Sequence, residues 1–294
     1  MIMFTIIITS IILIALIVGT ITDIKTREVP DWINFSLVGL GLGIRLIVSL
    51  ISNDFSFIFE GLIGFGVFFV IGLIMFYTGQ WGGGDSKMLI GLGALMGIPY
   101  TNWTSLFVVM KMPFLSFFIN SVIVGSLYGL VWSFYVALLN RKRFLKEFKK
   151  AKQMISDLKW VMIILFIILA IFAIIVDDIF VKILIVALII GVYSSIYLLV
   201  FVKAVEKSCM IKYVSPLTVT EGDWIAKDVY VDGKFISGPK DLGIERKQLR
   251  KLINFYKKGK IKKVLIKVGI PFVPSFLIAY VLTLFYGNLL LAFI

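Results

Sequence analysis

Long uncharged apolar runs repeat along almost the whole of this 294-residue chain. Crossing the hydrocarbon core of a bilayer takes roughly 20 apolar residues in an α-helix. Eight runs approach that length, at about 2–21, 32–51, 61–78, 86–99, 113–139, 160–176, 179–202 and 273–294. The fourth run is short, so we expect a tilted or partly buried helix there. The runs predict an all-α polytopic membrane protein with six to eight transmembrane helices.

Composition agrees with this prediction. Hydrophobic residues make up 60% of the chain and charged residues only 16%, which is too apolar for an ordinary soluble domain. A cleaved signal peptide is the alternative interpretation of the first run. No Lys or Arg precedes that run and no small-residue cleavage site follows it, so we expect a membrane span instead.

The positions of the 30 Lys and Arg residues explain the formal charge of +13. Eight lie in 141–159 and sixteen in 203–267, whereas loops expected on the opposite side carry acidic residues. Lys and Arg concentrate in the cytoplasmic loops of membrane proteins. We therefore expect a multi-pass protein of the cell membrane, with its N-terminus outside and its basic loops in the cytoplasm. Nucleic acid is not an expected partner.

The polar segments divide the chain into five predicted parts. These are a transmembrane core at 1–140, an amphipathic cytoplasmic loop at 141–159, a transmembrane helix pair at 160–202, a cytoplasmic module at 203–268 and a C-terminal transmembrane helix at 269–294. In the loop, Phe144 and Phe148 recur at helical spacing among basic residues. This pattern predicts a helix on the inner leaflet, and membrane lipids are expected partners of the basic loops.

The module at 203–268 shows both strand and helix patterns. Residues 224–231 alternate in part, Asp232-Gly233 is a hairpin turn signal, and 234–236 begins a return strand. A helix is predicted at 245–258 and a further strand at 264–268. The module is therefore predicted to be a small α+β subdomain near the C-terminus.

Few residue types remain for chemistry. The chain has no His and one Cys, Cys209, so it lacks the commonest catalytic base and cannot form a disulfide framework or a four-Cys zinc site. We expect no metal and no cofactor. Ionisable residues within spans or at their ends are costly, which makes them the first functional candidates.

Asp85 lies in the segment Trp81-Gly-Gly-Gly-Asp-Ser-Lys87, directly before the apolar run at 88–98. Three consecutive glycines allow close approach of another chain, so an extended peptide backbone can pass there. The alternative is that Asp85 simply caps the following helix. Ser86 is expected to start that helix, and not to act as a nucleophile, because no general base besides the aspartates is present nearby.

Asp23 follows the first apolar run and is predicted at the membrane level of Asp85. A first helix that runs inward and a fourth that runs outward both meet the cytoplasmic face. Two close carboxylates share a proton, so one can act as general base on water while the other polarises a carbonyl group. This chemistry needs no His, Cys or metal.

Two motifs carry a family resemblance. Asp23-Ile-Lys-Thr-Arg-Glu-Val-Pro-Asp-Trp32 resembles the first aspartate motif of type IV prepilin peptidases, an Asp followed four residues later by Arg and then by a hydrophobic-Pro-Asn/Asp step. Gly82-Gly-Gly-Asp85 resembles their Gly-x-Gly-Asp motif. Both occur in order, about sixty residues apart, in a multi-span chain. The polar module, Gly-Ile-Pro-Phe-Val-Pro at 269–274 and a last span resemble the archaeal prepilin and preflagellin (archaellin) peptidases.

The resemblance implies an intramembrane aspartyl protease of the GxGD type. It implies that Asp23 and Asp85 are the catalytic pair and that Gly82 and Gly84 shape the loop that presents Asp85. The implied substrates are membrane-inserted prepilin or archaellin precursors, cleaved at the cytoplasmic face to remove a short basic leader. The Cys-x-x-Cys pair of bacterial prepilin peptidases is absent, so methyltransferase activity is not expected.

Arg27 and Lys87 are candidate supporting residues. Each can form a salt bridge with a neighbouring carboxylate or act as a positive-inside anchor, and the anchor is the preferred interpretation. Two other functions compete with a protease. A transporter would use the aspartates to relay ions, with Arg45 as its one obviously buried charge, and a noncatalytic scaffold would carry both motifs by chance.

Overall fold

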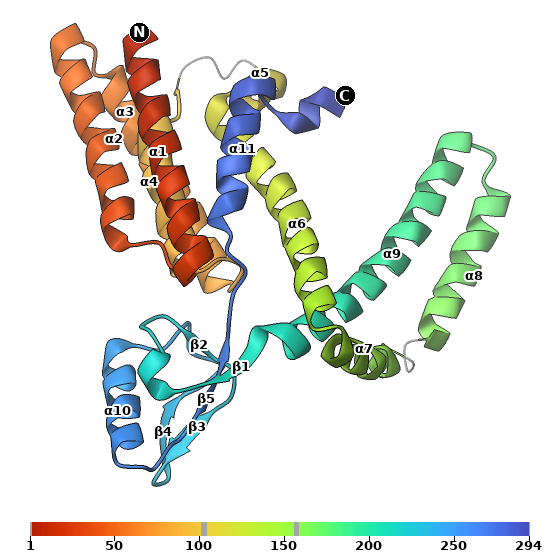
Figure 1. Cartoon of the computed structure of the whole chain (residues 1–294). Helices are drawn as coiled ribbons and strands as arrows, with labels where there is room; N and C mark the ends of the chain where they lie inside the picture. The colour runs from red at the N-terminus through yellow and green to blue at the C-terminus, as the bar shows by residue number, and fades with distance from the viewer. Residues whose placement is uncertain (1, 101–104, 156–158, 294) are drawn as a thin grey trace. The chain divides into compact units, whose positions relative to one another are not determined.

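The computed structural model describes residues 2–100, 105–155 and 159–293 (Figure 1). Outside the described residues lie 1, 101–104, 156–158 and 294. They include one end of the predicted 1–140 part, one end of the predicted 269–294 part, and three residues of the predicted 141–159 loop. The chain forms two compact units. The first unit comprises Met1–Val131 and Gly269–Ile294, and the second comprises Trp132–Val268.

Helices make up the first unit. They are α1 (Ile2–Thr26), α2 (Asp31–Ser52), α3 (Ser56–Tyr77), α4 (Gly83–Met96), α5 (Leu106–Met110), the first part of α6 (Pro113–Leu139), α11 (Val273–Tyr286) and the 3₁₀ turn η4 (Leu289–Phe293). Helix α4 packs extensively against both α2 and α3, and α1 packs against α11. The N-terminal and C-terminal parts of the chain therefore build one helical unit.

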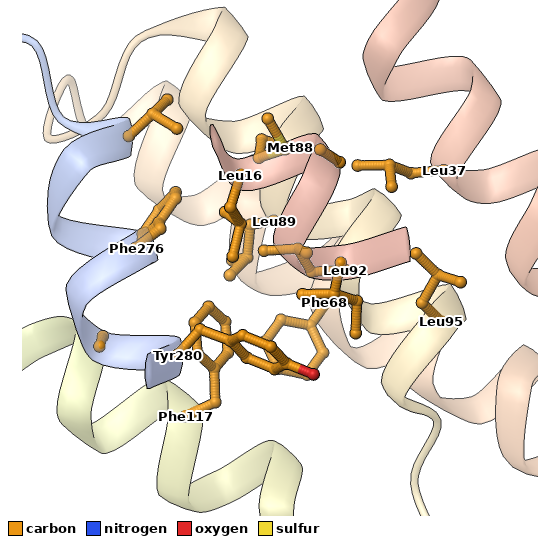
Figure 2. Close-up of a cluster of buried hydrophobic side chains, with 14 of the residues drawn as sticks. Leu16, Leu37, Phe68, Met88, Leu89, Leu92, Leu95, Phe117, Phe276 and Tyr280 are labelled. Atoms are coloured by element: carbon orange, nitrogen blue, oxygen red, sulfur yellow. The ribbon is translucent and has the colours of Figure 1, made fainter. Parts of the chain in front are cut away.

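Helix α4 lies at the centre of this unit, as the short fourth run predicts. Figure 2 shows its buried side chains Met88, Leu89, Leu92 and Leu95 in one cluster with side chains of other helices, namely Leu16, Leu37, Phe68, Phe117, Phe276 and Tyr280. Glycine permits the close packing, because a Cβ on Gly93 would lie 2.6 Å from the carbonyl oxygen of Gly64. A helix that is apolar on most of its circumference is stable only when it is buried in this way or lies in lipid.

The prediction of a polytopic helical membrane protein is confirmed. Among the described residues, α1, α2, α3, α6 and the segment Ile179–Met210 are long and apolar enough to cross a membrane. Two shorter apolar helices are Trp160–Ile175 and Val273–Tyr286. Many large hydrophobic side chains on these helices are exposed, as expected for surfaces that face lipid and not water.

The second unit contains α7 (Arg141–Ile155), α8 (Lys159–Ile175), α9 (Ile179–Val205) and the π-helical turn η2 (Glu206–Met210), followed by the polar module. Helix α7 forms at the predicted amphipathic segment. The Phe144 ring lies 5.5 Å from both the Phe148 and the Phe201 rings. Part of the apolar face of α7 therefore packs against α9.

The polar module is a small α+β fold, as predicted. Its elements are β1 (Ile211–Val214), the 3₁₀ turn η3 (Pro216–Thr218), β2 (Trp224–Ile225), β3 (Val229–Val231), β4 (Lys234–Ser237), α10 (Arg246–Lys257) and β5 (Val264–Lys267). Strands β3 and β4 form the predicted antiparallel hairpin, and both Asp232 and Gly233 have positive φ in its turn. A second antiparallel sheet has the order β1-β5-β2. The pairing of β1 with β5 was not predicted, because no turn signal before β1 marks it as a strand in the sequence.

Candidate active site

Asp23 lies in the last turn of α1 and not in a following loop. The helix continues to Thr26, beyond the apolar run that predicted it. It ends where Arg27 takes a left-handed conformation with φ of 63°, and the Arg27 N–H donates to the Asp23 carbonyl at 2.9 Å. Asp23 is buried, with 4% exposure. Its carboxylate is therefore held by a rigid helix inside the first unit.

The Asp23 side chain contacts the start of α11, 250 residues away in the sequence. The backbone N–H of Val273 donates to Asp23 Oδ2 at 2.9 Å. Val273 is the first residue of α11. The first amides of a helix have no partner within the helix and carry partial positive charge, so they favour a carboxylate at this position.

Asp85 lies within the first turn of α4 and does not precede the helix. The helix begins at Gly83, which makes Asp85 its third residue. The Gly82 N–H donates to Asp85 Oδ2 at 3.1 Å. This contact is a capping interaction, as the simpler interpretation of Asp85 proposed. It involves one carboxylate oxygen and is compatible with a second role for the side chain.

The two aspartate motifs meet in the first unit. The carboxylates of Asp23 and Asp85 are close enough for the charge of Asp23 to act on Asp85. A Cβ on Gly84 would lie 3.3 Å from both Cβ and N of Val29, so the first turn of α4 packs directly on the first motif. Gly82 contributes the amide that binds Asp85. The structure thus brings together the residues that the sequence singled out.

The candidate supporting cations also have acidic neighbours. Lys87 Nζ lies 2.6 Å from Asp31 Oδ1 in an ion pair. Burial lowers the pKa of the Arg27 guanidinium, and the nearby charges of Asp23 and Tyr128 oppose this shift. Arg27 Nη1 also donates to the Gly269 carbonyl at 3.2 Å. Lys87 thus forms one of the salt bridges weighed for these two residues. For Arg27, both the salt bridge and the positive-inside anchor stay predictions.

Sequence comparison identifies the region that carries both motifs. Residues 10–139 match the type IV leader peptidase family. A preflagellin peptidase of Methanocaldococcus jannaschii is 41% identical over 83 residues, which cover 28% of this chain and 35% of that protein. A preflagellin peptidase of Methanococcus maripaludis is 32% identical over 126 residues, covering 42% and 54% of the two chains.

A third relative has a different printed name. The prepilin peptidase EppA of Methanothermobacter thermautotrophicus is 28% identical over 144 residues, covering 46% of this chain and 37% of that protein. The chain thus spans about a third to a half of the length of these curated relatives. The resemblance to archaeal type IV prepilin and preflagellin peptidases is confirmed.

Three residues next to the two aspartate motifs were not assigned a role from the sequence. Tyr128 of α6 lies close enough to Asp23 and Arg27 to interact with both charges. Trp81 precedes the glycine loop and is buried, and Phe272 packs against it with ring centroids 5.5 Å apart. Aromatic residues make up 15% of this chain, so no local pattern distinguishes these three. Only the tertiary contacts reveal them.

Arg45 has a structural role in the leader peptidase region. Its side chain is buried and donates to the carbonyls of Leu95 and Met96 at the end of α4, at 2.9 and 2.6 Å. Its Nη1 lies 3.6 Å from Glu60. A cation at a helix C-terminus stabilises the helix dipole and satisfies its last carbonyls. These contacts give a structural reason for the buried charge of Arg45, which by itself is poor support for a transporter.

Other polar groups near the site are less informative about chemistry. Ser86 is buried in the first turns of α4, and its hydroxyl has no hydrogen-bond partner among the described residues. Within the same residues, no group of three or more His, Cys, Asp and Glu side chains is arranged to hold a metal ion.

Proposed function

We propose that this chain is an intramembrane aspartyl endopeptidase that removes short basic leader peptides from prepilin or preflagellin-like precursors. Asp23 and Asp85 are the catalytic residues, and they lie in the predicted 1–140 core. Gly82 and Gly84 shape the loop that presents Asp85. No methyl transfer accompanies the cleavage.

The observation that carries this proposal is the meeting of Asp23 and Asp85. They come from the end of one helix and the start of another, within a region that matches the leader peptidase family. The charge of Asp23 acts on Asp85. Two interacting carboxylates in a partly dry environment do not readily both ionise, and one proton is then shared between them.

The shared proton gives the two carboxylates complementary roles. The ionised carboxylate accepts a proton from water, and the resulting hydroxide attacks the carbonyl carbon of the scissile peptide bond. The protonated partner donates a hydrogen bond to the carbonyl oxygen and stabilises its developing charge. Collapse of the tetrahedral intermediate with proton transfer to the amide nitrogen releases the leader. One pair of carboxylates therefore supplies both the base and the acid.

The membrane topology fits substrates of this kind. By the positive-inside rule, the N-terminus lies outside and the basic loops and polar module lie in the cytoplasm. Both aspartates then lie at the cytoplasmic ends of their helices. A precursor with a basic leader in the cytoplasm and an apolar helix in the membrane presents its cleavage site at the same depth. Anionic lipids attracted to the basic loops are expected neighbours.

Cleavage of a candidate precursor in proteoliposomes tests the proposal. The full chain is compared with Asp23→Asn and Asp85→Asn, which keep the side-chain shape and remove the carboxylate. Asp54→Asn is the matched control, because Asp54 is exposed in the turn between α2 and α3 and binds the N–H of Ser56. We expect cleavage by the full chain and the control, and at least a hundredfold loss in both other variants.

Expression and thermal stability of the four proteins are matched before the rates are compared. Retained cleavage by Asp23→Asn or Asp85→Asn would remove that residue from the catalytic pair. Loss of cleavage in the Asp54→Asn control would show that the assay reports folding and not catalysis.

A further inference from the structure

The segment 269–273, which ends at the first residue of α11, contacts the first aspartate motif and Trp81, the residue directly before the second motif. Phe272 and Val273 lie outside residues 10–139, the region that matches the leader peptidase family. They are nevertheless part of the same compact unit as both motifs. The segment follows the polar module in the sequence, only a few residues after β5 ends at Lys267.

On one side, the segment holds Asp23. The Val273 N–H donates to Asp23 Oδ2 at 2.9 Å, in a contact that is buried from solvent. A Cβ on Gly19, one turn before Asp23, would lie 3.3 Å from Val273 Cγ1. Helices α1 and α11 therefore approach closely at this level, and the hydrogen bond fixes the orientation of the carboxylate.

A second contact holds the same segment on the first motif. Arg27 Nη1 donates to the carbonyl of Gly269 at 3.2 Å. Arg27 belongs to the first motif and Gly269 opens the segment. The segment is thus attached to the first motif at two points, four residues apart.

On the other side, the segment packs on Trp81, just before the helix that carries Asp85. The Trp81 ring lies 5.5 Å from the Phe272 ring and 5.2 Å from the Phe276 ring, between centroids. Trp81 is buried and directly precedes the three glycines. Glycine is a weak helix former, so the first turn of α4, which contains Gly83 and Gly84, depends on packing from outside the helix. An anchored aromatic ring at its entrance therefore limits where Asp85 can lie.

We propose that Phe272 and Val273 are positioning residues that fix the position of the Asp23 carboxylate relative to the Asp85 carboxylate. The Val273 amide orients Asp23, and the Phe272 ring orients the glycine loop through Trp81. This inference rests on the proposed function, because the relative position of the two carboxylates matters for the rate only if they act together. A displacement of about 1 Å in a catalytic group can cost on the order of a hundredfold in rate.

The packing around Phe272 offers a direct test. A Cβ on Gly125 would lie 2.4 Å from Phe272 Cζ, so Gly125→Ala must displace the ring. Phe272→Leu removes Cζ and the stacking on Trp81. We expect each variant to lower kcat about tenfold or more with KM nearly unchanged. The double variant should be no slower than Phe272→Leu alone, because leucine leaves room for the added methyl group.

Trp81 variants and a core control separate positioning from general stability. Trp81→Phe keeps an aromatic ring and should retain most of kcat, whereas Trp81→Leu should match Phe272→Leu. Phe68→Leu is the matched control, because Phe68 is equally apolar, 1% exposed and packed on α4 at Gly93, two turns beyond Asp85. We expect this control to lower thermal stability and to leave kcat of the folded protein within about twofold.

Hydrogen exchange supplies a readout that does not depend on activity. Phe272→Leu should speed amide exchange in the peptide that contains Trp81 and Asp85, and Phe68→Leu should not. Unchanged exchange and unchanged kcat in Phe272→Leu would overturn the inference, as would an equal loss of kcat in Phe68→Leu. Failure of the proposed function would look different, since the unmodified chain would then not cleave the precursor, or Asp23→Asn would cleave it as fast, while the exchange measurement would still report on the Phe272 contact.

Discussion

The ammonium group of Lys87 lies 2.6 Å from the carboxylate of Asp31, so an ion pair joins the first turns of α4 and α2. Lys87 follows the second aspartate closely, and Asp31 closes the first motif. The pair therefore connects the two motifs at their exposed edge. Its side chains are 45% and 60% exposed, which limits its strength because water and salt screen such pairs.

A double-mutant cycle with Lys87→Met and Asp31→Asn measures this connection. We expect a coupling free energy of unfolding of about 0.2–1 kcal/mol in low salt, and a smaller value at high salt. Thermal or chemical unfolding of the protein in detergent provides the measurement. A coupling well above this range, or one insensitive to salt, would show that the pair is more protected than its exposure indicates.

Neighbouring glycines of the loop should respond differently to alanine. A Cβ on Gly84 would lie 3.3 Å from backbone and side-chain atoms of Val29, whereas a Cβ on Gly83 would meet only Phe76, at 3.6 Å. We expect Gly84→Ala to separate the motifs and lower kcat about tenfold. Gly83→Ala should keep its activity and gain up to about 1 kcal/mol of stability from better helix propensity.

Rates and unfolding midpoints of the two alanine variants, made in parallel, check this difference. Equal activity of the two variants would mean that the contact between Gly84 and Val29 does not control the position of Asp85.

Arg45 should matter for stability and not for the chemical step. Its guanidinium is 3% exposed and binds carbonyls of Leu95 and Met96 beside Glu60. Arg45→Met would leave these groups buried without a partner. We expect the free energy of unfolding to fall by about 3–5 kcal/mol, as measured by denaturation in detergent.

Glu60→Gln is the control for Arg45, because the Glu60 side chain is 26% exposed and water can replace part of its contact. Its cost should be about 1 kcal/mol or less. The folded fraction of Arg45→Met should cleave normally. A selective loss of kcat in this variant would connect the far end of α4 to catalysis.

Tyr128 should assist the reaction through Asp23 and Arg27, because it lies close enough to interact with the charges of both side chains. Tyr128→Phe removes the hydroxyl and keeps the ring. We expect kcat to fall about tenfold, which corresponds to roughly 1.4 kcal/mol of lost interaction with a charged group. Tyr135→Phe, on the same helix at an exposed position, should cleave at the unmodified rate. Equal rates for both variants would exclude a role for the Tyr128 hydroxyl.

Local patterns predicted much of this fold. Hydrophobic runs predicted the long helices, Asp232-Gly233 predicted the hairpin turn between β3 and β4, and the 245–258 periodicity predicted α10. Each of these signals depends on residues close together in the sequence. Boundaries were less accurate, because α1 continues to Thr26 and α4 starts at Gly83. Polar residues at helix ends extend a helix without extending its apolar run.

The sequence by itself determined that this chain is a membrane protein and that Asp23 and Asp85 occur in two recognisable motifs. Length, apolar periodicity and motif spacing are properties of the chain and need no partner. Only the tertiary structure decided that the Val273 amide binds Asp23, that Phe272 packs on Trp81 and that Arg45 donates to a carbonyl at the C-terminal end of α4. These contacts join residues about 50 to 250 positions apart. They depend on which helix faces pack together, and no local pattern specifies that choice.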